Sequence, residues 1–364
     1  MRQSITLLSG IFIVMAISNA IVPVLPSFAQ AEPALQGAIY SAYFFGAFLT
    51  VLPAGLLSDR IGKTPLIRLG LLLTCMSGIL IILFPAVLPV LAARTLEGIG
   101  AGLFVPSALA WINSQPNHRS LSGHFIAALN LGLLTGLLGT GWLEMSMGAT
   151  GGVVLFTALS AVPLVMSAYI SEVREEERRK VHLAETFRVH FWLYISTVVL
   201  IGVTGVVTAL YPEFTGESAS LLSVQIGMMH AATMATSLAA SRLSFEPVRT
   251  VRISALLMAT AVMLSFVAPS LGLYAVLLMF AVIGGVAGFI INAQLAYLGA
   301  MGVQQGALMG LFNTATYAGM TLLPFAAGII AQTSGFAPAF FVMALTTASM
   351  AFTIGRCRCG DAAH

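Results

Sequence analysis

The sequence has very little charge. Asp, Glu, Lys and Arg make up only 8% of its 364 residues, whereas a soluble domain carries about 25%. So few charges could not cover the surface of a soluble protein of this length, and 58% of the residues are hydrophobic. Repeated apolar runs of about 20 residues are each long enough to cross roughly 30 Å of hydrocarbon. These features predict an all-α membrane protein.

Motifs of enzymes and cofactor sites are absent from the sequence. It contains no His-Glu-x-x-His pair, no phosphate-binding Gly-x-x-x-x-Gly-Lys loop and no Gly-x-Ser-x-Gly nucleophile motif. Of its three cysteines, Cys357 and Cys359 are separated by one residue, which is not the spacing of a structural zinc site. We expect no enzymatic activity, no cofactor, no metal and no nucleic-acid partner. Without a nucleotide site, transport driven directly by ATP on this chain is not expected.

Apolar runs predict twelve membrane spans. They cover residues 5–28, 36–57, 66–84, 88–111, 121–143, 149–170, 191–212, 220–241, 251–269, 272–298, 306–331 and 335–355. The one long hydrophilic segment, residues 171–190, divides them into six and six, as in a parallel duplication. We therefore expect an N-terminal six-helix bundle over 1–170, a cytoplasmic linker over 171–190, and a C-terminal six-helix bundle over 191–364 with a short cytoplasmic tail.

The basic residues predict the orientation. Fifteen of the sixteen Lys and Arg fall in alternate loops, counted from the amino terminus, and the opposite loops hold none. Cytoplasmic loops carry the excess of Lys and Arg, so both termini are predicted to be cytoplasmic. The short loops fit a prokaryotic cytoplasmic (inner) membrane, with membrane lipids around the chain.

The sixteenth basic residue, Arg94, lies inside the fourth span. Glu97 follows one helical turn later on the same face, close to the middle of the membrane. Ionisable groups at this depth are costly and are often functional. We predict that Glu97 binds a coupling proton and that Arg94 tunes its proton affinity; the alternative is a structural pair that neutralises itself. His230, in the eighth span, is a further titratable candidate, or simply a hydrogen-bonding group.

Uncharged polar residues concentrate in spans other than the third, sixth, ninth and twelfth. This distribution predicts that those four spans face lipid and that the others line a central cavity. Any one Asn or Tyr can also serve as a hydrogen-bonding group between helices. The candidate cavity residues are Asn19, Tyr43, Asn130, Thr204, Asn292, Asn313 and Tyr317. Such a lining suits a neutral or weakly charged small molecule.

A short charged hairpin separates the second and third spans. Its sequence is Gly55-Leu-Leu-Ser-Asp-Arg-Ile-Gly-Lys-Thr-Pro65. Thr64 is expected to cap the next helix, with the proline at its first position. Gly62 is expected to supply a left-handed turn, and Gly55 to allow close approach of a neighbouring helix.

This hairpin resembles the signature loop between helices two and three of the major facilitator superfamily. Arg94-x-x-Glu97-Gly-x-Gly-x-Gly102 is similar to the family's helix-four motif, in which Gln is commoner at the Glu97 position. The resemblance spans the whole chain and implies two pseudo-symmetric six-helix bundles, in a monomer, that rock about a central site. We expect the hairpin to be a conformational latch formed by Gly55, Asp59, Arg60, Gly62 and Lys63; the alternative for the two cations is a plain topology signal.

The sequence also departs from the drug:proton antiporter branch that it most resembles. Leu137 stands where the helix-five motif has proline, and Asn19 stands where many proton-driven members have an acid. The primary expectation is proton-coupled efflux of a small organic solute by alternating access. An importer or facilitator of a small neutral or weakly charged nutrient is the second possibility, and a non-transporting membrane sensor is a third and weaker one.

Overall fold

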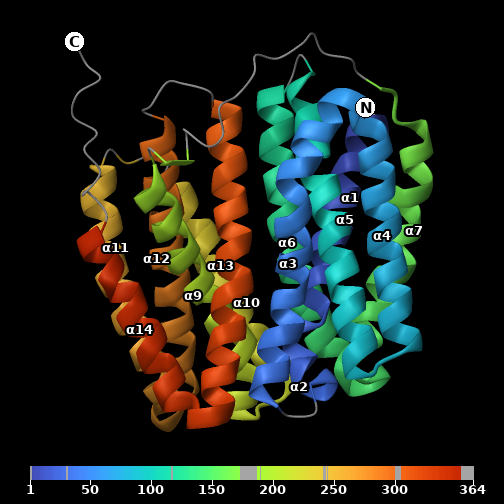
Figure 1. The fold of residues 1–364 in the computed structure, drawn as a ribbon. Coiled ribbons are helices and arrows are strands. Elements are labelled where there is room, and N and C mark those ends of the chain that lie inside the picture. Colours follow the sequence, from blue (N-terminus) through green and yellow to red (C-terminus); the bar gives the residue numbers. More distant parts are fainter. Residues whose placement is uncertain are drawn as a thin grey trace, which may run out of the picture. The chain divides into compact units, whose positions relative to one another are not determined.

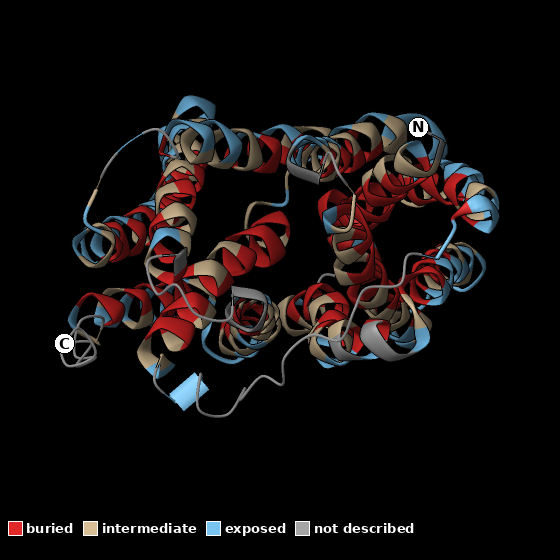
Figure 2. Cartoon of the chain, turned by 90° about the horizontal axis from the view of Figure 1, so that it is seen from above, coloured by how far each residue is buried: buried red, intermediate tan, exposed pale blue. Residues whose placement is uncertain are grey.

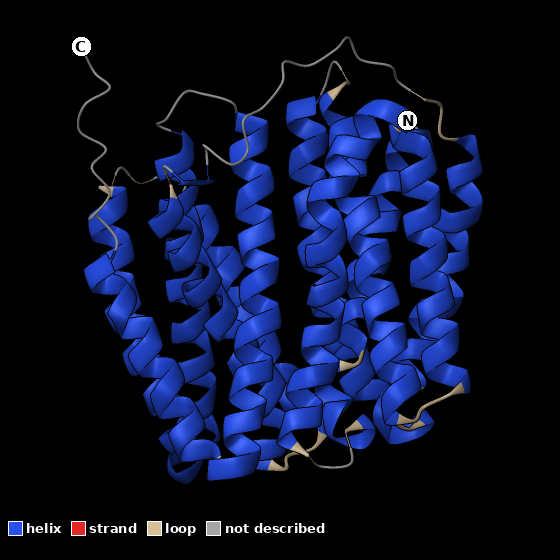
Figure 3. Ribbon diagram, in the orientation of Figure 1, coloured by secondary structure: helices blue, strands red, loops and turns tan. Residues whose placement is uncertain are grey.

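The computed structural model describes residues 2–29, 32–115, 118–172, 187–188, 190–240, 243, 245–299 and 305–353. Within these ranges the chain is helical, with short turns and no strand (Figure 3). Its long helices are α1 (Arg2–Ala20), α3 (Pro33–Ile61), α4 (Lys63–Leu83), α5 (Val87–Asn113), α6 (His118–Met147), α7 (Gly151–Met166), α9 (Phe191–Thr215), α10 (Ala219–Ala240), α11 (Pro247–Leu271), α12 (Leu273–Gly299), α13 (Gln305–Ser334) and α14 (Phe336–Thr353) (Figure 1). The prediction of an all-α membrane protein is confirmed.

Eleven spans in the described part of the chain are long and apolar enough to cross a membrane. The predicted eighth span forms the 22-residue helix α10, which is long enough but is not among the eleven. Its sequence carries Gln225, His230 and several Thr and Ser residues, which lower its hydropathy. The eleven spans and α10 correspond one to one with the twelve predicted spans.

The first predicted span is a broken helix. Helix α1 ends at Ala20, a 3-10 turn η1 covers Val22–Val24, and the short helix α2 covers Leu25–Phe28. Pro23 accounts for the break, because proline lacks the N–H that would bond to the carbonyl four residues earlier and its ring clashes with that carbonyl. Carbonyl groups at the end of α1 therefore need partners from elsewhere.

The chain forms two compact units, which we describe separately. Unit 1 comprises residues 1–178 and 209–227; unit 2 comprises residues 179–208 and 228–364. In unit 1, α5 packs on α3 and α4, and α1 packs on α6. The core between these helices is rich in Leu, Ile and aromatic side chains, including Leu7, Leu71, Phe104 and Trp111. In unit 2, α11 packs on α12 and α14, and a second core includes Tyr194 and Phe312.

Burial follows the pattern expected of helices in lipid. Figure 2 shows buried residues on the helix faces that meet other helices and exposed residues on the opposite faces. The exposed faces carry large apolar side chains such as Leu83, Trp142, Leu271 and Tyr274. Exposed apolar surface on this scale fits contact with hydrocarbon, since soluble monomers rarely expose large contiguous apolar patches.

Candidate functional site

Arg94 and Glu97 form an ion pair inside unit 1. Arg94 Nη1 lies 2.7 Å from Glu97 Oε2, with both residues on α5 at the predicted three-residue spacing. Their side chains are 1% and 0% exposed. A charge pair so far from solvent keeps its geometry only when other polar groups satisfy it.

The break in the first helix supplies one of those groups. Arg94 Nη1 also donates to the backbone carbonyl of Ser18, at 3.1 Å, two residues before α1 ends. The end of a helix carries partial negative charge, so the guanidinium group both satisfies a free carbonyl and complements the helix dipole. The guanidinium carbon lies 4.8 Å from the centroid of the Tyr43 ring on α3, within cation–π range. Arg94 thus joins α1, α3 and α5.

Two atoms of the pair are left without a hydrogen-bond partner. They are Arg94 Nε and Glu97 Oε1, both buried. An unsatisfied buried polar atom costs about 1–3 kcal/mol, so it calls for an explanation. The free carboxylate oxygen can take up a proton, and the free N–H can donate to another group.

Close packing of α3 on α5 places the pair. A Cβ at Gly98 would collide with the backbone carbonyl of Tyr43, so α5 can lie this close to α3 only because residue 98 is glycine. Likewise, a Cβ at Gly46 on α3 would collide with the backbone carbonyl of Thr95 on α5. Gly98 and Gly46 therefore set the distance between α3 and α5, and with it the distance between the Tyr43 ring and the guanidinium group.

The charged hairpin turns at Gly62. Its φ is 95°, in the region that favours glycine, which confirms the predicted turn. The predicted cap was wrong: α4 begins at Lys63, before Thr64, with no side-chain cap from the hairpin. Glu172 caps the helix instead, accepting bonds from the backbone N–H groups of Lys63 (2.8 Å) and Thr64 (2.9 Å). A carboxylate there also complements the positive end of the helix.

The environment of Glu172 favours its charged form. Partial burial alone would raise the pKa of Glu172, but the hydrogen bonds from the Lys63 and Thr64 backbone outweigh it and hold the pKa below its ordinary value. Gly62 is needed here too, because a Cβ at that position would overlap the Glu172 carboxylate. Glu172 thereby holds the segment that follows α7 against the start of α4.

The other predicted latch residues are Gly55, Asp59, Arg60 and Lys63. The side chains of Asp59 and Arg60 lie outside the described part of the structure. Lys63 is 3% exposed, so its ammonium group is not presented freely to solvent. No atom of unit 1 lies within 4 Å of a Cβ placed at Gly55, so a close helix contact there stays a prediction.

The predicted cavity residues are only partly brought together. Asn19 lies next to Ser18 and donates to the carbonyl of Leu133 on α6, at 3.3 Å, and Tyr43 lies against Arg94. Three others bond to carbonyls of their own helices: Asn130, Thr204 and Asn292. Asn313 is exposed on α13, Tyr317 is half-buried on the same helix, and His230 is half-buried on α10.

Sequence reasoning missed two contributors to these contacts. The Ser18 carbonyl is one, although Pro23, five residues later, is a signal for the helix break that frees it. Glu172 is the other; it lies in the predicted linker, and no local spacing connects it to residues more than one hundred positions earlier. The ring of Tyr43 was predicted to line the cavity, not to support Arg94.

A bundle of membrane-crossing helices with a buried ion pair is typical of a transport protein. The comparisons with known proteins identify the family. The Major Facilitator Superfamily model matches residues 7–302, more than half of the sequence. The chain therefore belongs to the major facilitator superfamily and is a multi-pass membrane protein.

Solved transporters share the fold at low sequence identity. The POT family transporter PepTSo matches with a TM-score of 0.80 at 10% identity, covering 98% of this chain and 97% of that one. A D-xylose-proton symporter matches with a TM-score of 0.79 at 13% identity, over 98% and 97%. Nucleoside transporter NupG matches with a TM-score of 0.78 at 12% identity, over 99% and 100%. These likenesses show the major facilitator fold.

One curated relative is similar in sequence over part of the chain. Multidrug resistance protein 2 of Bacillus subtilis (strain 168) is 27% identical over 172 residues. The match covers 46% of this chain and 43% of that protein, so the chain spans less than half the length of the relative it matches.

Proposed function

We propose that this transporter exports a small organic solute in exchange for protons, by alternating access between its two predicted bundles, 1–170 and 191–364. Glu97 is the proton-binding group and Arg94 is its partner. The observation that carries the proposal is the fully buried ion pair, whose cation Arg94 also donates a hydrogen bond to the Ser18 carbonyl near the end of the broken first helix.

Protonation of Glu97 would change how α5 is held. In the charged state Arg94 contacts Glu97, the Ser18 carbonyl and the Tyr43 ring. Once Glu97 is neutral, the attraction within the pair is lost, and Arg94 keeps only its contacts to α1 and α3. Conformational states that hold Arg94 in different positions would therefore differ in the proton affinity of Glu97. Such a difference in affinity is the condition for proton binding to drive a conformational change.

One observation supports export, and another supports a neutral or weakly charged organic solute. The partial match is to a protein named for multidrug resistance. The candidate cavity side chains Asn19, Tyr43, Thr204 and Asn292 are uncharged, which suits a neutral or weakly charged molecule.

Import or facilitated diffusion of a small nutrient is the second candidate. It is favoured by Asn19, which places an amide where many proton-driven members have an acid and uses it to bond α1 to the Leu133 carbonyl. Leu137 in place of a helix-five proline favours it as well.

A transport assay tests the proton site. A thermal-shift screen of the purified protein against drugs, sugars, amino acids and organic acids selects the transport probe; hits confined to sugars or amino acids would favour the nutrient transporter. In proteoliposomes with an imposed pH gradient, Glu97→Gln should abolish gradient-driven accumulation of the probe. Glu246→Gln, which removes an exposed carboxylate at the start of α11, is the matched control and should not. Undiminished accumulation by Glu97→Gln would remove Glu97 from the mechanism.

We also propose that the hairpin of Gly55, Asp59, Arg60, Gly62 and Lys63 is a conformational latch on the cytoplasmic side of an inner-membrane monomer with both termini cytoplasmic. Asp59→Asn should slow transport and shift the protein toward the inward-open state without abolishing probe binding. Site-directed accessibility labelling measures the shift. An unchanged labelling pattern would leave the hairpin as a topology signal.

A further inference from the structure

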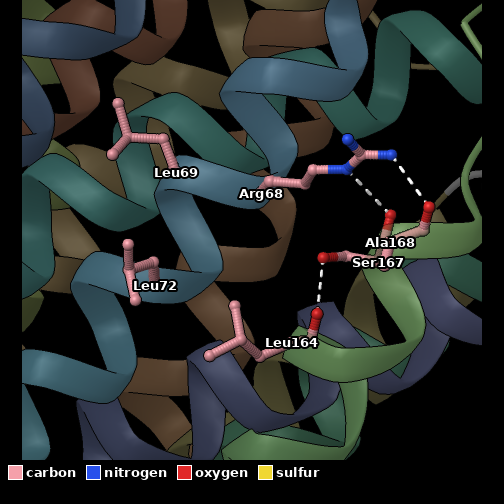
Figure 4. Close-up of a pocket in the computed structure, with 6 residues that line it drawn as sticks. All are labelled: Arg68, Leu69, Leu72, Leu164, Ser167 and Ala168. Carbon is pink, nitrogen blue, oxygen red and sulfur yellow. Dashed lines mark hydrogen bonds between the residues drawn. The ribbon is translucent and has the colours of Figure 1, made fainter.

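A groove runs along the outside of unit 1 between α4 and the end of α7 (Figure 4). Its volume is about 420 Å³, and it is lined by Arg68, Leu69, Leu72, Leu164, Ser167 and Ala168. One end is therefore cationic and the other is formed by three leucines. No part of the proposed proton site contributes to it.

The guanidinium group at the charged end is held in a fixed position. Arg68 Nε donates to the Ser167 carbonyl at 3.0 Å, and Nη2 donates to the carbonyls of Ala168 (3.0 Å) and Ile170 (3.2 Å). In Figure 4 the side chain extends away from Leu69 and Leu72 toward Ser167 and Ala168. Its positive charge lies at the end of α7, where the helix dipole favours a cation.

The charge of Arg68 is not cancelled by a carboxylate in the groove. The lining residues include no acid. Glu172, four residues after Ala168, directs its carboxylate oxygens to the Lys63 and Thr64 N–H groups. Arg68 is exposed, so an anion can reach the edge of the guanidinium group that the carbonyls do not occupy.

The apolar end of the groove faces out of the bundle. Leu69 and Leu72 are each 43% exposed. Val165 on α7 and Tyr169 in the 3-10 turn η2 (Ser167–Tyr169) are more exposed still, and an exposed tyrosine is typical of the membrane interface. The groove therefore begins at the interface and continues toward the hydrocarbon.

We propose that this groove binds one anionic glycerophospholipid. The lipid phosphate pairs with Arg68, and an acyl chain lies along Leu69, Leu72 and Leu164. A soluble anion would leave the leucines unused, and a zwitterionic lipid brings its own cation to compete with Arg68. The groove lies where α4 begins and α7 ends, the side on which the basic loops are predicted, and anionic lipids are enriched in the cytoplasmic leaflet.

Native mass spectrometry of the full chain tests the site, with phosphatidylglycerol and phosphatidylcholine of identical acyl chains as probes. The wild-type protein should bind phosphatidylglycerol several-fold more tightly. Arg68→Gln should weaken phosphatidylglycerol binding about fivefold and remove the preference, since a basic residue near an anionic surface contributes about 1 kcal/mol. Arg249→Gln, which removes another exposed basic residue near a helix start, should leave the preference intact.

A second variant tests the apolar end and does not depend on the folding of Arg68→Gln. Leu72→Trp fills the groove from an exposed position and should weaken binding of both lipids. Excess inorganic phosphate should not displace phosphatidylglycerol. Equal binding of the two lipids by wild type, equal effects of Arg68→Gln and Arg249→Gln, no effect of Leu72→Trp, or full displacement by phosphate would each overturn the proposal.

Discussion

Two carboxylates in unit 1 are held at helix ends in opposite ways. Glu172 is exposed and accepts bonds directly from the amino end of α4. Glu97 is fully buried and accepts a hydrogen bond from Arg94, which also donates to the Ser18 carbonyl at the carboxyl end of α1. The positive charge of Arg94 is favourable at that end of the helix. The Glu172 carboxylate accepts hydrogen bonds from two backbone N–H groups and is exposed to solvent. The Glu97 carboxylate depends on one cation and retains an unpartnered oxygen.

The difference indicates what each carboxylate can do. Two backbone hydrogen bonds stabilise the charged form of Glu172 and favour a permanent structural cap. Burial penalises the charged form of Glu97, and a single side chain, that of Arg94, compensates it. Any movement of Arg94 would therefore change the balance between charged and neutral Glu97, whereas the two donors to Glu172 belong to the backbone of a helix.

The largest expected effect follows from removing the cation of the buried pair. Arg94→Met leaves Glu97 without a counter-ion and the Ser18 carbonyl without its donor, and should lower the free energy of unfolding by about 3–5 kcal/mol. Arg94→Met combined with Glu97→Leu should recover about half of that loss, because the uncompensated charge is gone. Unfolding in detergent measures both variants. Additive losses would show that the two side chains are not coupled.

A smaller effect is expected from moving the pair as a whole. Gly98→Ala places a methyl group against the Tyr43 carbonyl, pushes α5 from α3 and should cost about 1–3 kcal/mol of stability. Gly55→Ala is the matched control, because its methyl group would meet no atom of unit 1 within 4 Å. Thermal unfolding compares the two. If they behave alike, the close approach of α3 and α5 is not what positions Arg94.

The smallest effect is expected at the exposed carboxylate. Glu172→Gln should cost about 0.5 kcal/mol at neutral pH, the low end for a helix cap, because Glu172 is exposed. Its pKa is lower in the folded protein than the ordinary 4.5, so the stabilisation is present above that value and is lost as the pH falls through the folded pKa.

The wild-type protein and Glu172→Gln should therefore converge in thermal stability as the solution is acidified from pH 7 to below 4.5. Melting curves across this range measure the difference between them. A gap that stays constant, or widens on acidification, would contradict the assignment of Glu172 as a charged cap.

The sequence predicts the local features of the fold and few of the distant contacts. Apolar runs locate the helices, and the three-residue spacing predicts the contact between Arg94 and Glu97, because both features repeat along a single chain segment. Local sequence favours Thr64 as the cap on α4 because Thr64 lies at the start of that helix, whereas Glu172 comes from the segment that follows α7. Asn130 and Asn292 show the same limit, since polarity alone does not distinguish a cavity-lining amide from one bonded to its own helix.

Infrared difference spectroscopy of the purified protein across a pH titration tests the central claim most directly, because it detects the carbonyl stretch of a protonated carboxyl group in an apolar environment without any substrate. The account predicts that the wild-type protein and Glu172→Gln both gain this band on acidification, and that Glu97→Gln does not. A band that persists in Glu97→Gln, or is absent from wild type throughout the pH range in which the protein stays folded, would contradict the assignment of Glu97 as the proton-binding group.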